Sequence, residues 1–307
     1  MDTNILLENG TNELEVLEFT IGDKHYGINV AKIREILSYQ PVTPIPNSDS
    51  TVEGIFMPRD TMITVIDLSA CLGFEPMSEG GLFIITNFNK LNIAFHVEQV
   101  LGIHRVSWTD IIKPDATVNA NDASVTTGII KFDDKLIIIL DFEKIVSDIN
   151  PETGLRVSQI EEMGNGDRDR GDSTILIAED SPLLSKLISS CLKKAGYVNL
   201  DVNPDGKAAW DRLCEIKSQG DPHSQIDCII TDIEMPLMDG HRLTKLVKED
   251  DQMKEIPLII FSSLINDEMR RKGEQLGANA QLSKPEIGQL VEAIDKLIDE
   301  SRASKAS

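Results

Sequence analysis

The sequence predicts two domains of different class, an all-β domain followed by an α/β domain. In residues 14–150, short apolar runs alternate with glycine and aspartate turns, which is typical of a β-barrel or β-sandwich. In residues 174–301, apolar strand-like runs alternate with amphipathic helical patterns, which predicts a parallel sheet with helices on both faces. Residues 151–173 are polar, glycine-rich and mixed in charge, and they are predicted to be a flexible linker.

Composition limits the possible partners. The chain has 30 basic and 51 acidic residues, a formal charge of −21, and both predicted domains share the acidic excess. Because neither half offers the basic face that a phosphate backbone requires, we expect no nucleic-acid partner. Four widely spaced cysteines suit a reducing compartment. No apolar run approaches membrane-spanning length and the first residues lack a basic signal region, so we expect a cytoplasmic protein without direct membrane insertion.

The first half begins with a predicted β-hairpin. Val16–Ile21 and His25–Val30 flank the turn signal Gly22-Asp23. Residues 30–37 fit a short helix or a continued strand equally well, and a proline-rich loop follows them. Six more short apolar runs are predicted to be strands, at residues 54–56, 62–66, 82–86, 92–97, 128–130 and 135–140.

An internal repeat lies within these runs. Residues 54–67 align with residues 128–141 at one constant offset, and both read Gly-Ile, strand, aspartate turn, strand, aspartate. The alignment favours two similar hairpins that arose by duplication, with chance similarity between amphipathic hairpins as the alternative. The half contains no nucleophile elbow, zinc-protease or phosphate-loop motif, and His25, His96 and His104 are isolated. A β domain without such chemistry is best interpreted as a binding module.

The second half contains four apolar runs that we predict to be buried strands of a parallel sheet. Helical patterns separate them; the first begins at Ser181-Pro182, a serine cap with proline in the first turn. Further helices are predicted from Gly206 and Gly240 and over residues 267–276 and 286–298. The predicted strands are Thr174–Ala178, Cys228–Ile230, Ile256–Phe261 and Ala278–Leu282.

Polar side chains follow the carboxyl ends of these four strands. Glu179 and Asp180 follow the first, Asp232 the second, Ser262 ends the third, and Lys284 follows the fourth. Carboxyl ends of parallel strands meet at one edge of the sheet, where ligands bind. Clustered carboxylates need a cation, and a hard divalent ion such as Mg²⁺ suits oxygen ligands and a phosphoryl substrate. Asp232 is then the candidate nucleophile that forms an aspartyl-phosphate.

This arrangement resembles the receiver domain of response regulators, with Glu179-Asp180, Asp232, Ser262 and Lys284-Pro285 in the family's order. The resemblance implies a flavodoxin-like (βα)5 fold and no catalysis beyond the domain's own phosphoryl acceptance and loss. It also implies Mg²⁺ held by Glu179, Asp180, Asp232 and the backbone carbonyl of Glu234, with Ser262 and Lys284 contacting phosphoryl oxygens. The alternative is an unrelated flavodoxin-like domain with scattered surface acids.

The sequence departs from the receiver pattern at the switch position. Three residues before the lysine, receivers commonly carry an aromatic residue that reports phosphorylation, and this chain carries Gln281. A glutamine cannot fill an apolar slot without burying its amide, which costs free energy unless the amide is hydrogen-bonded. We therefore expect Gln281 to stay near the surface, with output through Ser262–Leu264 and the helix that follows.

The first half resembles the CheW family of chemotaxis coupling proteins, through residues 19–28, 33–36, 54–59 and 65–68 in order. The resemblance implies a double barrel, two small five-stranded β-barrels. It places Glu35 and Arg59 in regions tied to kinase and receptor contacts, although Arg59 could also be a solvated turn residue. Where the family often has Leu-Arg-Gly, this chain has Pro58-Arg59-Asp60, so the turn geometry is open.

A CheW-like domain followed by a receiver resembles the CheV group of chemotaxis proteins. The resemblance implies an adaptor that couples chemoreceptors to the chemotaxis histidine kinase, is regulated by phosphorylation at Asp232, and is recruited to membrane receptor arrays through its partners. One alternative is a phosphate sink that draws phosphoryl groups from the kinase. A second is a receiver-controlled hydrolase, which the lack of a nucleophile motif disfavours.

Overall fold

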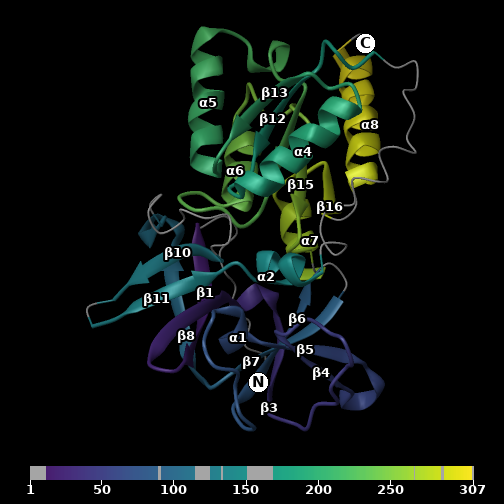
Figure 1. Cartoon of the computed structure of the whole chain (residues 1–307). Coiled ribbons are helices and arrows are strands. Elements are labelled where there is room, and N and C mark those ends of the chain that lie inside the picture. The colour runs from purple at the N-terminus through teal and green to yellow at the C-terminus, as the bar shows by residue number, and fades with distance from the viewer. Residues whose placement is uncertain are drawn as a thin grey trace. The chain divides into compact units, whose positions relative to one another are not determined.

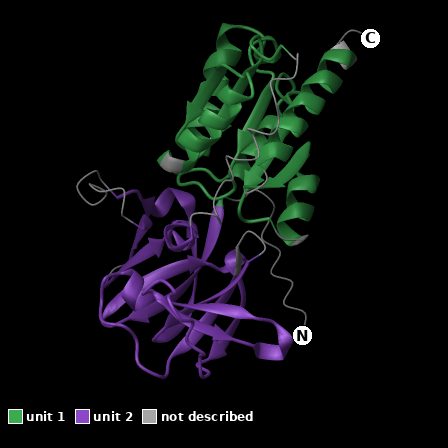
Figure 2. Cartoon of the chain, turned by 45° about the vertical axis from the view of Figure 1, so that its right-hand side comes forward, with its two compact units in different colours: residues 1–12, 154–307 green, residues 13–153 purple. Residues whose placement is uncertain are grey.

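The computed structural model describes residues 12–88, 91–114, 125–132, 134–150, 169–265, 267–284 and 287–305. The chain forms two compact units, Glu13–Thr153 and Met1–Asn12 with Gly154–Ser307 (Figure 2). Most of the predicted linker lies outside the described residues. Among the helices that the structure describes, none is both long and apolar enough to span a membrane.

Residues 13–153, purple and keyed as unit 2 in Figure 2, come first along the chain and are called the first unit. This unit is built from two β-sheets (Figure 1). One has strand order β8-β1-β2-β11-β10-β9 and the other has order β3-β6-β7-β5-β4. Two helices follow strands, α1 (Leu68–Cys71) and α2 (Phe142–Ile149), and residues 30–37 form one 3-10 turn and then a strand. The strands are β1 (Glu13–Ile21), β2 (Lys24–Asn29), β3 (Ile33–Ser38), β4 (Val52–Phe56), β5 (Ile63–Asp67), β6 (Leu82–Phe88), β7 (Leu91–Val97), β8 (Gln99–Ser107), β9 (Ile111–Ile112), β10 (Thr126–Lys131) and β11 (Leu136–Leu140).

Three apolar clusters show how the two sheets are arranged. One cluster, around Val16 and Trp108, is lined only by elements of the first sheet, and another, around Phe83, only by the second. The third, around Phe19 and Phe95, joins both sheets and α2. The predicted all-β class with two barrel-like halves is therefore confirmed. The expectation of five strands in each half is wrong for the first sheet, because the two-residue strand β9 adds a sixth.

The internal repeat is confirmed as a structural repeat. In both copies a β-hairpin runs into a helix whose first turn is capped by the second aspartate of the motif: Asp67 Oδ1 accepts from Ala70 N at 3.1 Å, and Asp141 Oδ1 accepts from Lys144 N at 2.9 Å. The glycine that opens each copy lies at a register shift. An added Cβ at Gly54 would lie 2.1 Å from the Thr43 carbonyl oxygen, so the close strand packing requires glycine there.

His96 on β7 is buried with both ring nitrogens hydrogen-bonded. Its Nδ1 lies 2.5 Å from Glu53 Oε1 and its Nε2 lies 2.7 Å from the carbonyl oxygen of Gly80. A carboxylate and a carbonyl oxygen can only accept, so with Glu53 ionised these two hydrogen bonds require a proton on each ring nitrogen, the imidazolium form. Burial lowers the pKa of His96, but the hydrogen bonds to Glu53 and Gly80 outweigh it and raise the pKa above its ordinary value.

The stability of the first unit should therefore fall at alkaline pH. Because the folded-state pKa of His96 is raised, its contribution is fully present below the unfolded pKa and is lost as pH rises through the folded pKa. The expected loss is about 1 kcal/mol, the net value of one hydrogen bond. Urea unfolding of the full chain with Trp210→Phe, which leaves Trp108 as the one tryptophan, measures the loss at several pH values. His96→Gln should flatten the profile, and an unchanged profile in that variant would contradict the prediction.

The second unit contains a five-stranded parallel sheet in the order β13-β12-β14-β15-β16 (Figure 1). The predicted α/β receiver-type fold is thus confirmed. Helices cover both faces, with α4 and α8 packed together on one of them. The strands are β12 (Thr174–Ala178), β13 (Asn199–Asn203), β14 (Cys228–Thr231), β15 (Leu258–Ser262) and β16 (Ala280–Ser283), and the helices are α4 (Pro182–Lys194), α5 (Gly206–Gln219), α6 (Gly240–Glu249), α7 (Asp267–Gln275) and α8 (Ile287–Lys305).

Residues described before the first strand of this sheet also contribute to the unit. Arg170, which falls in the predicted linker, donates two hydrogen bonds to the carboxylate of Asp295 on α8, at 2.9 and 2.8 Å, and a third to the carbonyl of Ala195. Tyr197 donates to the same carboxylate at 2.6 Å. A bidentate arginine–carboxylate pair fixes direction as well as distance, so the chain enters the unit against α8 and the end of α4.

Candidate functional site

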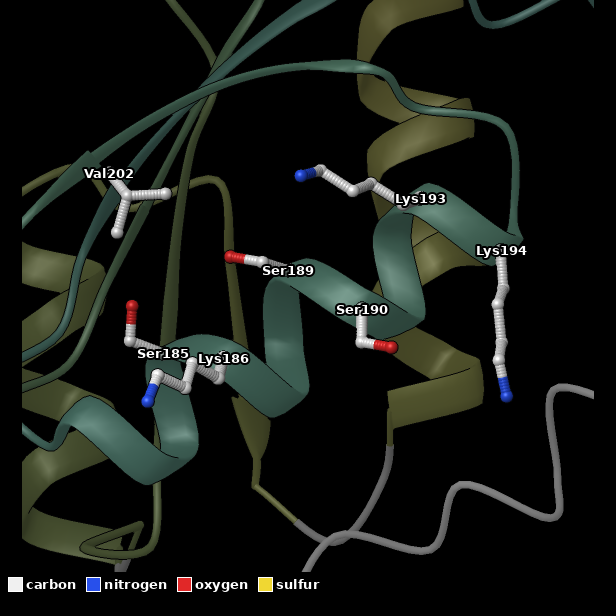
Figure 3. Close-up of a pocket in the computed structure, with 7 residues that line it drawn as sticks. All are labelled: Ser185, Lys186, Ser189, Ser190, Lys193, Lys194 and Val202. Carbon is white, nitrogen blue, oxygen red and sulfur yellow. The ribbon is translucent and has the colours of Figure 1, made fainter.

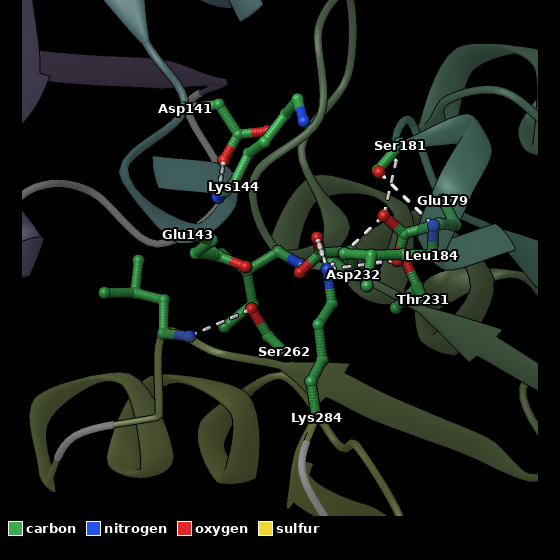
Figure 4. Close-up of polar contacts among 12 residues, drawn as sticks. Asp141, Glu143, Lys144, Glu179, Ser181, Leu184, Thr231, Asp232, Ser262 and Lys284 are labelled. Atoms are coloured by element: carbon green, nitrogen blue, oxygen red, sulfur yellow. Dashed lines mark hydrogen bonds and ion pairs between the residues drawn. The ribbon is translucent and has the colours of Figure 1, made fainter. Parts of the chain in front are cut away.

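The register of the parallel strands determines which side chains meet at the carboxyl edge of the sheet. Ala178 pairs with Thr231, Thr231 with Ile260, and Ser262 with Ser283. The residues just beyond these pairs therefore meet at one edge, where Figure 4 shows Glu179, Ser262 and Lys284 around Asp232. The apolar runs that predicted buried strands thus also determine the place of the site.

Three carboxylates form a cluster at this edge. One oxygen each from Glu179, Asp180 and Asp232 lies within 4.8 Å of the others, and this is the one group of metal-ligand type found among the described residues. Glu179 and Asp232 are only 2% and 5% exposed. Burial raises the pKa of Glu179 well above its ordinary value, the charges of Asp232 and Asp180 add to this, and Lys284 opposes it.

The ammonium group of Lys284 neutralises part of this charge. Its Nζ lies 2.5 Å from Asp232 Oδ2 and 3.1 Å from Glu179 Oε2, and the lysine is 4% exposed. Oε2 of Glu179 is nevertheless buried without a hydrogen-bond partner. Three clustered carboxylates, one with an oxygen that has an ion pair but no hydrogen bond, are chemically suited to a hard divalent cation. The residues therefore fit Mg²⁺, with Glu179, Asp180 and Asp232 as the oxygen donors.

The backbone around Asp232 is tightly constrained. Its Oδ1 accepts from the N–H of Ile233 at 2.6 Å, and its carbonyl oxygen accepts from Thr231 Oγ1 at 2.8 Å. Gly240, the first residue of α6, lies so close that an added Cβ would be 1.8 Å from the Asp232 carbonyl oxygen. The start of α6 therefore fixes the peptide that carries the candidate nucleophile, and only glycine leaves room for this approach.

Ser262 lies at the neighbouring strand end and is 1% exposed. Its Oγ accepts from the N–H of Leu264 at 3.2 Å, and its carbonyl oxygen accepts from the N–H of Lys284 at 3.3 Å. The hydroxyl and the lysine are thus linked through the backbone. Glu234 lies in the loop between β14 and α6, and a role for its carbonyl remains a prediction.

The predicted partner-binding residues lie in the first unit. Glu35 is half-buried on β3, and Arg59 is exposed in the β4–β5 turn. Arg59 and Asp60 have φ of 52° and 65°, both left-handed, and Thr61 N donates to the Pro58 carbonyl at 3.2 Å. Two consecutive left-handed residues define a hairpin turn that glycine and asparagine favour. Asp60 therefore has a backbone conformation that is strained for most residues with a side chain.

Gln281 lies half-buried on the edge strand β16, with one exposed and one buried side of its amide. Its Nε2 donates to the carbonyl of Arg270 on α7 at 2.7 Å, and its Oε1 is buried without a partner. The amide therefore lies between β16 and α7, because a donor within reach of a helix carbonyl makes burial tolerable. Gly273, a glycine inside a helical pattern, was the sequence signal that could have indicated a close neighbour on α7.

A surface hollow of about 640 Å³ lies on a different part of this unit. It lies beside α4 and the edge strand β13 and contains none of the predicted site residues (Figure 3). The acid cluster, by contrast, is mostly buried and lies at the carboxyl edge of the sheet, so the hollow and the chemistry do not coincide. The lining residues are Ser185, Lys186, Ser189, Ser190, Lys193, Lys194 and Val202.

Comparison with known proteins matches two family models to this chain, a CheW-like domain over residues 15–150 and a response regulator receiver domain over residues 175–295. Chemotaxis protein CheV3 of Helicobacter pylori is 28% identical over 94% of this chain and 96% of its own length. CheV2 of the same organism is 28% identical over 89% and 90%. Chemotaxis protein CheW of Thermotoga maritima is 30% identical over 48% of this chain and 98% of its own length.

Proposed function

We propose an adaptor function for this chain, since it belongs to the CheW family of chemotaxis proteins and carries a response regulator receiver domain behind its CheW-like domain. The CheW-like domain, residues 14–150, couples chemoreceptors to the chemotaxis histidine kinase. Glu35 and Arg59 contribute to those contacts. A linker, residues 151–173, tethers the receiver, residues 174–301, and the partners recruit the chain to receptor arrays.

The receiver regulates this coupling through phosphorylation of Asp232. The observation that carries the proposal is the buried Asp232 carboxylate beside Lys284 and two further acids. A carboxylate oxygen of Asp232 attacks the phosphorus of a phosphohistidine, the P–N bond breaks, and the histidine leaves. Mg²⁺ held by Glu179, Asp180 and Asp232 would supply positive charge that offsets the charge of the phosphoryl group. Lys284 orients Oδ2 and the N–H of Ile233 orients Oδ1, and Ser262 supplies a hydroxyl to a phosphoryl oxygen.

Lys284→Ala should slow phosphorylation without abolishing it. The ammonium group stabilises added negative charge but forms no bond to phosphorus, and loss of one such donor costs roughly 100-fold in rate. A time course of label transfer from the phosphorylated kinase measures the effect. Lys186→Ala, a change of the same kind at an exposed position of α4, should keep the wild-type rate. Complete loss of label in Lys284→Ala would contradict the prediction.

Reconstituted arrays of receptor and kinase test the adaptor function. The full chain with intact acceptor and its Asp232→Asn variant are compared at a fixed phosphate flux. For an adaptor, both proteins bind receptor and kinase, and phosphorylation changes kinase activity per bound adaptor. For a phosphate sink, kinase activity depends only on the phosphate drained. A full chain that binds neither partner would refute the adaptor function.

A further inference from the structure

Side chains of two neighbouring elements hold the backbone of α7. Gln281 on β16 donates from Nε2 to the carbonyl of Arg270 at 2.7 Å. His241 on α6 is hydrogen-bonded to the backbone of Met269. Since its Nε2 has no partner, its Nδ1 is the nitrogen that makes this bond. Two consecutive residues of α7 are therefore fixed from outside the helix.

Both of these donors also carry a buried acceptor without a partner, Oε1 of Gln281 and Nε2 of His241. Leaving a buried acceptor unsatisfied costs about as much free energy as the hydrogen bond on the other side of the group returns. The two contacts therefore fix the position of α7 but add little net free energy to its stability. A helix held in this way can leave its position at little cost.

The Gln281 amide occupies the space left by the missing side chain of Gly273 on α7, and we call this space the seat. An added Cβ at Gly273 would lie 2.4 Å from Oε1 and 2.5 Å from Cδ of Gln281. Glycine inside a helix is less favourable than alanine. The space that Gly273 leaves for the Gln281 amide explains why glycine occupies this position despite that loss of helix stability. Gln281 and Gly273 are complementary in shape, and neither residue type alone would produce the contact.

The phosphorylation site is connected to this seat through a short path. Ser262 ends β15, and its Oγ accepts from the N–H of Leu264 in the segment that leads into α7. When the hydroxyl turns toward a phosphoryl oxygen, the N–H of Leu264 loses that acceptor. Leu264 precedes the start of α7 at Asp267 by three residues, so we expect the loss of this hydrogen bond to affect the position of that helix. Gln281 pairs with Ile260 of the same β15 strand.

We propose that Gln281 is a positioning residue that ties α7 to β16 before phosphorylation, and that its hydrogen bond to Arg270 is released when Asp232 is phosphorylated. The surface of α7 would then differ between the two states, and that difference is the signal available to a partner. A polar contact thus takes the place of the aromatic side chain common in receivers. The inference rests on the proposed function, because it requires phosphorylation of Asp232.

A double-mutant cycle on the full chain tests this proposal by amide exchange of α7, with and without beryllium fluoride and Mg²⁺ as a phosphoryl mimic. In the wild type, the mimic should raise exchange in residues 267–275. In Gln281→Ala, exchange without the mimic should already be about three- to tenfold faster, as expected for one lost hydrogen bond, and the mimic should add little.

The Gly273→Ala variant distinguishes loss of the Gln281 contact from a general loss of α7 stability. Alone, its methyl group displaces the amide and should raise exchange as Gln281→Ala does. In the Gln281→Ala background the same methyl has room, and alanine favours the helix, so exchange should fall. This reversal of sign is specific to the contact. Gln289→Ala, at an exposed position of α8, should change neither exchange nor the response.

The outcomes distinguish this inference from the proposed function. The inference is overturned if the wild type and Gln281→Ala respond equally to the mimic. It is also overturned if Gly273→Ala changes the exchange of α7 in the same direction in both backgrounds. In either case Gln281 does not position α7, while receiver function stands. If the wild type shows no change at residues 262–264 or in α7, phosphorylation control itself is refuted, and the inference falls with it.

Discussion

Replacing Asp232 with asparagine should abolish phosphorylation of this chain by its kinase and leave the fold intact. The amide is close to the carboxylate in shape, so the β14–α6 loop and the N–H of Ile233 keep an acceptor in the same place. It is a far weaker nucleophile and carries no charge for Lys284 or a cation to offset. We expect the label to fall by roughly 1000-fold or more, because the covalent step itself is removed.

Transfer of label from phosphorylated kinase to the full chain, followed over time, is the measurement. Asp251→Asn, at an exposed position that pairs only with Lys254 among the contacts described, should label at the wild-type rate. Removal of Mg²⁺ by a chelator should slow labelling of the wild type strongly, because the carboxylate cluster then lacks its compensating charge. Wild-type labelling of Asp232→Asn would place the acceptor elsewhere.

The site could be predicted from the sequence because its residues follow the strongest local signals in the chain. Buried strands such as β14 begin with a continuous apolar run, here Cys228–Ile230, so an acid just beyond it stands out. Parallel pairing then brings four such ends together without further information. The strand β13 was missed for the opposite reason: its sequence, Asn-Leu-Asp-Val-Asn, alternates with polar residues because it lies at the sheet edge.

Contacts between distant side chains could not be predicted in the same way. Glu18 is 1% exposed and accepts hydrogen bonds from Lys135, His104 and His25, and its pKa is lowered to about 2 because these bonds outweigh the effect of burial. The sequence shows a glutamate in a strand and isolated histidines, with His104 standing 86 positions after Glu18. Periodicity reports which face of a strand is buried, and only the fold determines which polar groups meet there.

For Gln281, the position in the motif could be predicted from the sequence but the contacts of its side chain could not. Its distance from Lys284 along the chain identified Gln281 as the switch position. Its side-chain contacts are with α7, and the local sequence around Gln281 does not encode how α7 packs. The decisive residue is Gly273, whose missing side chain leaves space for the amide. A prediction based on the residue type of Gln281 alone kept it near the surface, and it could not include the contact that its amide makes with α7.

Replacing Gly240 with alanine should disrupt the phosphorylation site without altering any chemical group in it. The added Cβ would lie 1.8 Å from the carbonyl oxygen of Asp232 and 3.0 Å from Thr231 Oγ1. Neither neighbour is the flexible end of a long side chain, so either the start of α6 or the Asp232 peptide must move. Overpacking of a well-packed core costs about 1–3 kcal/mol, and a clash with backbone lies at the upper end of that range.

The movement should reduce phosphotransfer as well as stability. A shift of about 1 Å in a reacting group costs roughly 100-fold in rate, and the Asp232 carboxylate is attached directly to the displaced peptide. Urea unfolding and the time course of label transfer measure the two effects on the same protein. Gly171→Ala is the matched control, since its Cβ would meet only the Asp169 side chain, at 3.4 Å. If Gly240→Ala kept both wild-type stability and wild-type transfer, the close approach of α6 would not be what positions Asp232.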